Sequence, residues 1–369
     1  MKNGVYWKER FQQMENARHD SSAEKIIEIQ EQIGKAQHVI EEKVNAWYQR
    51  FAINNDISLV EAQKQLNSKE LKEFKWDVKE YIKHGKENAV DQRWMKQLEN
   101  ASARVHISRL EQIKLHAQHY AEVAFGNYND ILDKHIKDLY KQDYYRTAYE
   151  IQKGTGVGYS FAGVNEDKLE KVISKPWASD GANFSDRIWA NKSKLISQLH
   201  TSLTQMCITG EGPDRAIKEI AKAMGSSKYQ AGRLVMTESA YFGSQAQKEC
   251  FNELDVEKYE IVAMLDSHTS DICQEMDGKV FKMSEYEAGV TAPLFHVNCR
   301  SCICPYFDDE FAGGKRAARG EDGKTYYVPA DMTYKEWKEK VVKEKDSDII
   351  KSGAISGARN PYGESDSKH

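Results

Sequence analysis

The sequence contains no long apolar run and no secretory signal. A helix that spans a membrane needs about 20 consecutive, mostly apolar residues, and no stretch of the chain comes near that length. The N-terminal segment reads MKNGVYWKERFQQMENARHD and lacks the apolar core of a signal peptide. We therefore expect a cytoplasmic product without a membrane partner, whose cysteines are reduced or bind a metal instead of forming disulfides.

The chain also lacks a surplus of positive charge. Its 53 Lys and Arg residues are outnumbered by 57 Asp and Glu residues, which leaves a net charge of −4. Proteins that bind DNA regardless of its sequence rely on attraction between basic side chains and phosphates. The basic residues Lys315, Arg316 and Arg319 lie in a glycine-rich stretch and are more typical of a solvated loop. Composition therefore gives no support for bulk DNA binding.

A phosphate-binding glycine loop is missing as well. The sequence GTGVGYSFAG at 154–163 matches neither G-x-G-x-x-G nor G-x-x-x-x-G-K-[ST], and it follows a predicted helix instead of a strand. We interpret this segment as the start of a glycine-rich hinge at 154–182, which separates two parts of the chain.

Helical periodicity dominates the part before this hinge. Apolar residues advance in steps of three and four between positions 26 and 51, and Ser21 with Glu24 has the pattern of a capping box that would open this helix. Helical patterns continue to about residue 152 after a turn at 54–56. We expect 1–153 to form a helical domain, whose long apolar stripe either closes a bundle or docks on a partner.

The part after the hinge combines helices with strands. Capping and breaking residues predict three helices. The first is expected to start at Asn183 or Ser185 and to end at Gly210, and the second to start at Pro213 and to end at Gly225. The third is expected to start at Ser226 or Ser227. Strand-like alternation begins at 259–265 and returns at 279–281 and 303–307. The predicted fold class is α+β: a long-helix N-terminal domain, a helical segment and a small β-containing C-terminal module. A loop and terminal helix at 312–345 and a disordered tail at 346–369 complete the chain.

The C-terminal strand region concentrates cysteine and histidine. Cys273, Cys299, Cys302 and Cys304 all lie within it, close in sequence to His296. Thiolates and neutral imidazole are the ligands that zinc prefers, and a metal would stabilise a small module of short strands. The alternative is that the reduced thiols pack as small apolar side chains. Both interpretations stay open.

A catalytic cysteine is a weaker hypothesis for the same residues. His268 with Cys273, or His296 with Asn298 and Cys299, supplies the types needed for a nucleophile and its base. Side chains that are neighbours in sequence, however, rarely converge when the chain is extended. We expect the protein not to be an enzyme.

Two ordered blocks of sequence carry a resemblance to a known family. The block LDSHTSDICQEMDGKVF, a loop, and the block PLFHVNCRSCICPYF follow one another, with the pair Thr237 and Glu238 upstream. This arrangement resembles the Mu F-like head morphogenesis domain of tailed-phage minor head proteins, and we assign it to 183–311. The segments YWKERF, ISRLEQI and NFSDRIW resemble other parts of these proteins. On its helix, Glu238 is expected to anchor a loop and not to act in catalysis.

The resemblance bears on the metal. Many members carry a C-x-x-C pair before an H-x-x-C-R segment, but here Ser270 stands at the first cysteine position. The matching residues are Cys273, His296 and Cys299, and a fourth ligand would be Cys302 or Cys304. The set predicted for a structural zinc ion is Cys273, His296, Cys299 and Cys302.

The resemblance also implies a function. Family members are minor head (capsid) proteins that associate with the portal and act in head morphogenesis and in DNA packaging, retention or delivery. The implied location is the virion, in the head interior near the portal, after assembly in the host cytoplasm. The implied partners are the portal protein, a scaffold or major capsid protein, and packaged DNA. The alternative is a metal-dependent nuclease or an effector or toxin enzyme carried in the virion.

Overall fold

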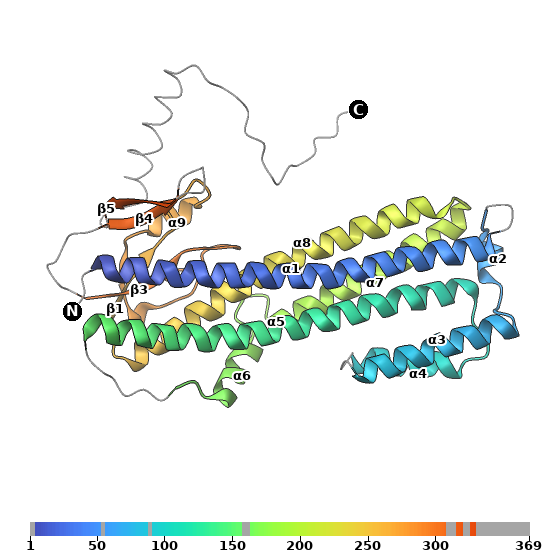
Figure 1. Cartoon of the computed structure of the whole chain (residues 1–369), viewed down its shortest axis with the longest axis horizontal. Coiled ribbons are helices and arrows are strands. Elements are labelled where there is room, and N and C mark those ends of the chain that lie inside the picture. The colour runs from blue at the N-terminus through green and yellow to red at the C-terminus, as the bar shows by residue number, and fades with distance from the viewer. Residues whose placement is uncertain are drawn as a thin grey trace, which may run out of the picture.

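Long helices that run side by side form the body of the protein, and a small sheet lies at one end of it (Figure 1). The computed structural model describes residues 4–52, 56–87, 91–156, 163–307, 315–319 and 325–329. The helices in this part of the chain are α1 (Gly4–Phe51), α2 (Leu59–Gln63), α3 (Ser68–Glu87), α4 (Gln92–Ala103), α5 (Arg109–Thr155), α6 (Glu166–Ser174), α7 (Phe184–Thr209), α8 (Pro213–Glu253) and α9 (Asp271–Met276), with a 3₁₀ turn at Met283–Glu285. The predicted α+β class is confirmed.

Helix α1 is antiparallel to both α5 and α8. Near its start, Trp7 lies against Gly154 of α5, whereas near its end the Trp47 indole donates a hydrogen bond to the carbonyl of Arg109. The contact between α1 and α8 has the same direction. Phe11, near the start of α1, packs on Phe251, near the end of α8, with 5.6 Å between the ring centroids. All three helices contribute side chains to the main core.

The apolar stripe of α1 closes this bundle. Ile29, Ile33, Ile40 and Val44 are fully buried in the main core. The predicted helix start at Ser21 is wrong, because α1 begins at Gly4 and is continuous through that position. Residues N-terminal to Ser21 continue the buried stripe, and their packing outweighs the local capping pattern.

Other helix ends follow the predicted capping chemistry. Asn183 caps α7 in a capping box with Asp186, and Gly210 ends this helix with a left-handed φ of 68°. Pro213 occupies the first turn of α8. The predicted break at Gly225 is wrong, because α8 continues through it as one helix of 41 residues that packs on α1, α5 and α7.

Helices α3 and α4 form a hairpin with a small core of its own. Asn67 and Glu70 exchange capping hydrogen bonds at the start of α3. The hairpin core consists of Leu66, Phe74, Val78, Tyr81, Trp94, Met95, Leu98, Ala101 and Ile107. This hairpin and α2 lie at the end of the bundle opposite the sheet (Figure 1).

The sheet has the strand order β2-β1-β3 and is antiparallel throughout. Its strands are β1 (Lys258–Val262), β2 (Val280–Lys282) and β3 (Cys302–Tyr306), close to the three predicted strands. Strand β3 packs on the N-terminal part of α1, where Trp7 lies 5.4 Å from Phe307 between ring centroids. The sheet is therefore tied to the first helix of the chain.

A second ladder follows the sheet in sequence. Strand β4 (Lys315–Arg319) pairs with β5 (Thr325–Pro329) in antiparallel register. The loop predicted at the start of 312–345 is wrong at 315–319, where β4 forms. The predicted terminal helix and the predicted disordered tail lie outside the described residues.

The main core spans both sides of the predicted hinge. It contains side chains of α1 and α5 together with side chains of α7, α8 and the three-stranded sheet. Within 154–182 the structure places the last two residues of α5 and all of α6. Among the described residues, no helix is both long and apolar enough to cross a membrane. The division of the chain into domains stays a prediction.

Candidate metal centre

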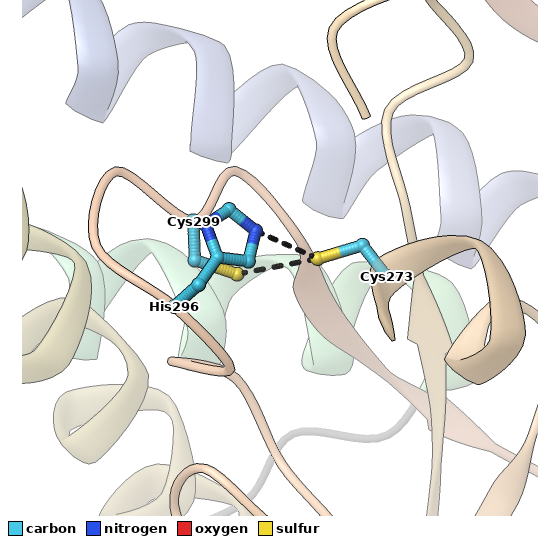
Figure 2. A group of neighbouring side chains, drawn as sticks. All are labelled: Cys273, His296 and Cys299. Atoms are coloured by element: carbon cyan, nitrogen blue, oxygen red, sulfur yellow. Dashed lines mark hydrogen bonds between the residues drawn. The ribbon is translucent and has the colours of Figure 1, made fainter. Parts of the chain in front are cut away.

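Three of the four predicted ligands meet beside the sheet. Cys273 comes from α9, and His296 and Cys299 come from the loop that leads into β3 (Figure 2). The Cys273 sulfur lies 3.1 Å from Nε2 of His296 and 3.7 Å from the Cys299 sulfur. All three ligand atoms lie within 4.8 Å of one another. Residues 26 positions apart thus form one compact group.

A tight turn brings His296 and Cys299 to the same side of the loop. The backbone N–H of Cys299 donates to the carbonyl of His296 at 3.1 Å. Asn298 between them has a φ of 61°, a left-handed conformation that asparagine tolerates better than most residues. Nδ1 of His296 lies 2.8 Å from the carbonyl of Val297, which leaves Nε2 directed at Cys273.

An ion pair holds this loop against the segment between β1 and α9. The Arg300 guanidinium donates to both carboxylate oxygens of Asp266, at 2.6 and 2.8 Å. Asp266 also accepts from the backbone N–H of His268 at 2.9 Å and from the Thr269 hydroxyl at 3.2 Å. Burial alone would raise the pKa of Asp266, but these hydrogen bonds and the Arg300 charge hold it below its ordinary value. The segment from Asp266 to Thr269 and the pair Cys299–Arg300 are therefore held together in the structure by the Asp266–Arg300 ion pair.

The two thiols differ in acidity because they face each other. The hydrogen bond from the Cys273 thiol lowers the pKa of Cys299, and His296 and the backbone N–H of Ser301 add to this effect against the influence of burial. The same contact, together with burial, raises the pKa of Cys273. The hydrogen bond with Cys299 raises the pKa of His296. The group thus favours a thiolate at Cys299, the form that binds metals.

The spacing of the sulfur atoms fits a tetrahedral ion. Two zinc–sulfur bonds of about 2.3 Å at a tetrahedral angle place the sulfurs about 3.8 Å apart, and Cys273 and Cys299 are separated by 3.7 Å. An imidazole nitrogen would lie about 3.5 Å from each sulfur in such a site, against the 3.1 Å from His296 to Cys273. An ion bound here would therefore require the imidazole to lie slightly farther from the Cys273 sulfur.

Cys302 does not join this group. It begins β3 opposite Val262, and its sulfur lies 3.8 Å from the Val262 carbonyl. Cys302 and Cys304 both belong to the main core, whereas Cys273 and Cys299 belong to a separate cluster with Ala263 and Leu294. Strand pairing therefore holds Cys302 away from the three gathered ligands.

Glu238 anchors a loop to α8, as predicted from the sequence. Its carboxylate accepts from the Trp177 indole at 2.8 Å and from the Arg187 guanidinium at 3.2 Å. Burial raises the pKa of Glu238, and these two partners oppose that rise. The carboxylate holds the α6–α7 connection and the first turns of α7 against α8.

Sequence reasoning missed a buried charge network beside the centre. Arg18 of α1 donates to Asp143 of α5 at 2.9 Å and also pairs with Glu15, and all three side chains are buried. A cavity of about 20 Å³, roughly the size of one water molecule, is lined by both Arg18 and Cys299. The only local signal was the presence of charged residues within the predicted helical domain.

Comparisons with known proteins agree on one family. Residues 197–304 match the family described as Phage Mu protein F like protein. Minor head protein GP7 of Bacillus phage SPP1 is 24% identical over 225 residues, which cover 56% of this chain and 70% of that protein. No solved structure matches the chain. The segment that matches the family contains α8, β1, β2, the start of β3, and the residues Cys273, His296 and Cys299. The resemblance to Mu F-like minor head proteins is confirmed.

Proposed function

We propose that this Mu F-like minor head protein associates with the portal during assembly of the phage head and serves DNA packaging, retention or delivery. Its place would be the head interior near the portal, after synthesis in the host cytoplasm. A scaffold or major capsid protein and the packaged DNA are further candidate partners. The observation that carries this proposal is the match of 197–304 to the Mu F-like family, together with the similarity to a named minor head protein.

The docking surface has to lie outside the α1 stripe, because that stripe is buried in the core. At the end of the bundle opposite the sheet, Trp76 of α3 is 64% exposed and Val60 of α2 is 73% exposed (Figure 1). Val105, just before α5, is 62% exposed. Exposed tryptophan is a common anchor of protein interfaces. We place the portal contact at this end, centred on the α3–α4 hairpin.

The test is incorporation into phage particles. Trp76→Ser removes the exposed indole without disturbing a buried contact, so the variant should fold normally and be depleted from particles about tenfold or more. Its matched control is Lys79→Ser, which changes an exposed residue one turn further along the same helix. Mass spectrometry of purified particles gives the copy number, and thermal unfolding of the isolated variants checks the fold. Normal copy number for Trp76→Ser would place the docking surface elsewhere.

We further propose that Cys273, His296 and Cys299 bind a structural zinc ion. The ion would join α9 to the loop before β3, and Arg300 of that loop also pairs with Asp266 in the segment before α9. Protein purified without chelator should then contain about one zinc per chain. Its removal should lower the melting temperature, and His296→Ala should abolish both the zinc and the chelator effect. An unchanged melting curve in chelator would favour thiols that simply pack in the core.

A non-enzymatic role completes this proposal, and a nuclease assay tests it. Purified protein should leave linear and supercoiled DNA intact in the presence of Mg²⁺, Mn²⁺ or Zn²⁺. Cleavage of DNA that depends on the metal and disappears in His296→Ala would instead support the nuclease or effector alternative.

A further inference from the structure

Two buried thiols lie in contact beside the sheet. The Cys273 sulfur lies 3.7 Å from the Cys299 sulfur, and the two residues are only 2% and 4% exposed. Both cysteines are free thiols, and they pack with Ala263 and Leu294 in one small cluster. A disulfide bond is about 2.0 Å long, so an approach of about 1.7 Å would turn this contact into a covalent bond.

The contact joins two short segments that are distant in sequence. Cys273 belongs to α9, a helix of six residues, whereas Cys299 lies in the loop that leads into β3. A shift of this size costs less in a short helix and a loop than in a paired strand. By contrast, Cys302 and Cys304 belong to β3, which pairs with β1 along its whole length. Cys273 and Cys299 are therefore the cysteines best placed to bond to each other.

Cys299 lies at a corner of the molecule that a small oxidant can reach. It borders the cavity of about 20 Å³ together with Asn298. The Asn298 residue is exposed, and His296, which lies beside the Cys273 sulfur, is partly exposed. The two thiols thus lie below a surface loop and outside the main core.

We propose that Cys273 and Cys299 are a reversible oxidation site and form a disulfide when a hydroperoxide reaches them. Thiols stay reduced in the cytoplasm, whereas disulfides persist in oxidising surroundings such as those of a released phage particle. The choice of the two residues rests on the sulfur contact, and the place of oxidation rests on the virion location proposed above. The disulfide and the proposed zinc ion exclude each other, because both use the same two sulfurs.

The reaction takes two steps and consumes one hydroperoxide. The Cys299 sulfur attacks the peroxide, so that a sulfur–oxygen bond forms, the oxygen–oxygen bond breaks, and one water leaves when the oxidant is hydrogen peroxide. The Cys273 sulfur then attacks the resulting sulfenic acid, which forms the sulfur–sulfur bond and releases a second water. The two sulfurs lose two electrons to the peroxide, and the two thiol protons leave in the two waters.

Thiol counting on the full-length protein in chelator tests the pairing. After brief treatment with hydrogen peroxide and denaturation in urea, the number of free thiols should fall by two from the six of the reduced chain. Peptide mapping without reductant should show the Cys273 peptide linked to the Cys299 peptide, and dithiothreitol should restore all six thiols. The matched control is Cys304→Ala, which should still form this link, whereas Cys299→Ala should form none.

The peptide map of the wild type decides the outcome even if a variant folds poorly. A different linked pair, such as Cys302 with Cys304, would overturn the proposal. Oxidation of Cys299 to a sulfinic acid without a disulfide would overturn it as well. Because the treatment is done in chelator, failure of the zinc proposal leaves this inference standing.

Phage particles provide the second test. Cells lysed directly into an alkylating reagent should contain Cys273 and Cys299 as thiols, whereas released particles alkylated in the same way should contain the disulfide. Thiols in both samples would overturn oxidation in the particle. Absence of the protein from particles would instead contradict the proposed function, and the thiol count would still decide whether the two cysteines pair.

Discussion

Asp266 and Arg300 show what a single pair of side chains contributes to this protein. The carboxylate of Asp266 lies in the segment between β1 and α9, and the guanidinium lies next to Cys299 in sequence. Both side chains are mostly buried, with 10% and 25% of their surfaces exposed. Because the two hydrogen bonds are parallel and charge-assisted, the pair fixes both the position and the orientation of the loop.

Arg300→Gln should therefore destabilise the protein by about 2 kcal/mol at pH 7, since it leaves a buried carboxylate without its cation. The pKa of Asp266 is lowered in the folded state, so the stabilisation is fully present above the unfolded pKa of about 4 and is lost as the pH falls through the folded pKa. Urea unfolding should thus show a difference between wild type and variant that narrows below about pH 4.

The control for this substitution is Arg215→Gln. Arg215 pairs with Glu211 on an exposed helix surface, with 70% of its side chain accessible. Its replacement should change the free energy of unfolding by less than about 0.5 kcal/mol at any pH. Equal effects of the two substitutions would contradict the structural role of the Asp266–Arg300 pair.

At the scale of elements, the contact between α1, α5 and α8 depends on a glycine. A Cβ atom at Gly243 of α8 would lie 1.9 Å from Nη1 of Arg18 and 2.5 Å from Oδ2 of Asp143. Both of those groups are held in a buried ion pair, so they have little freedom to move aside. Gly243 therefore permits the close approach of α8 to the charged pair that links α1 to α5.

Gly243→Ala should destabilise the protein by about 2–4 kcal/mol, although alanine is the better helix former, because the methyl group displaces buried charges. Gly225→Ala on the same helix is the matched control, since a Cβ there meets nothing within 4 Å. This second change should stabilise the protein by about 0.5–1 kcal/mol through helix propensity. Urea unfolding of both variants measures the two changes in the free energy of unfolding, which should have opposite signs. If Gly243→Ala instead stabilises the protein, the Arg18–Asp143 ion pair rearranges freely.

At the scale of the whole molecule, the first helix and the Mu F-like segment share one core. Phe251 of α8 packs on Phe11 of α1, Trp7 of α1 packs on Phe307, and Gln12 of α1 donates to the carbonyl of Ala263 at 3.2 Å. These contacts join residues that are more than 200 positions apart in sequence. Separation of the two parts would expose a large apolar surface on each.

We therefore expect a fragment of residues 183–311 not to fold cooperatively when it is expressed alone, and to recover its structure when 1–156 is supplied as a second chain. Circular dichroism melting and proton NMR dispersion of the fragment, with and without the N-terminal chain, measure this. A fragment that melts cooperatively by itself would instead support the division at the predicted hinge.

Much of the local structure follows from the sequence. Local interactions or side-chain type alone determine the caps at Asn183 and Gly210, the three strands of the sheet, and the thiol and imidazole groups of Cys273, His296 and Cys299. The family resemblance also lies in ordered blocks of sequence. These features are predictable because the interactions that cause them are short in sequence.

The tertiary structure decided the features that depend on distant residues. It placed the α1 stripe inside the bundle, continued α8 through Gly225, and held Cys302 in β3 outside the group of Cys273, His296 and Cys299. It also brought Arg18 to Asp143 across 125 positions. Hydrophobic burial and strand pairing between segments far apart in the chain cause each of these outcomes, and no local pattern reports which segments will meet.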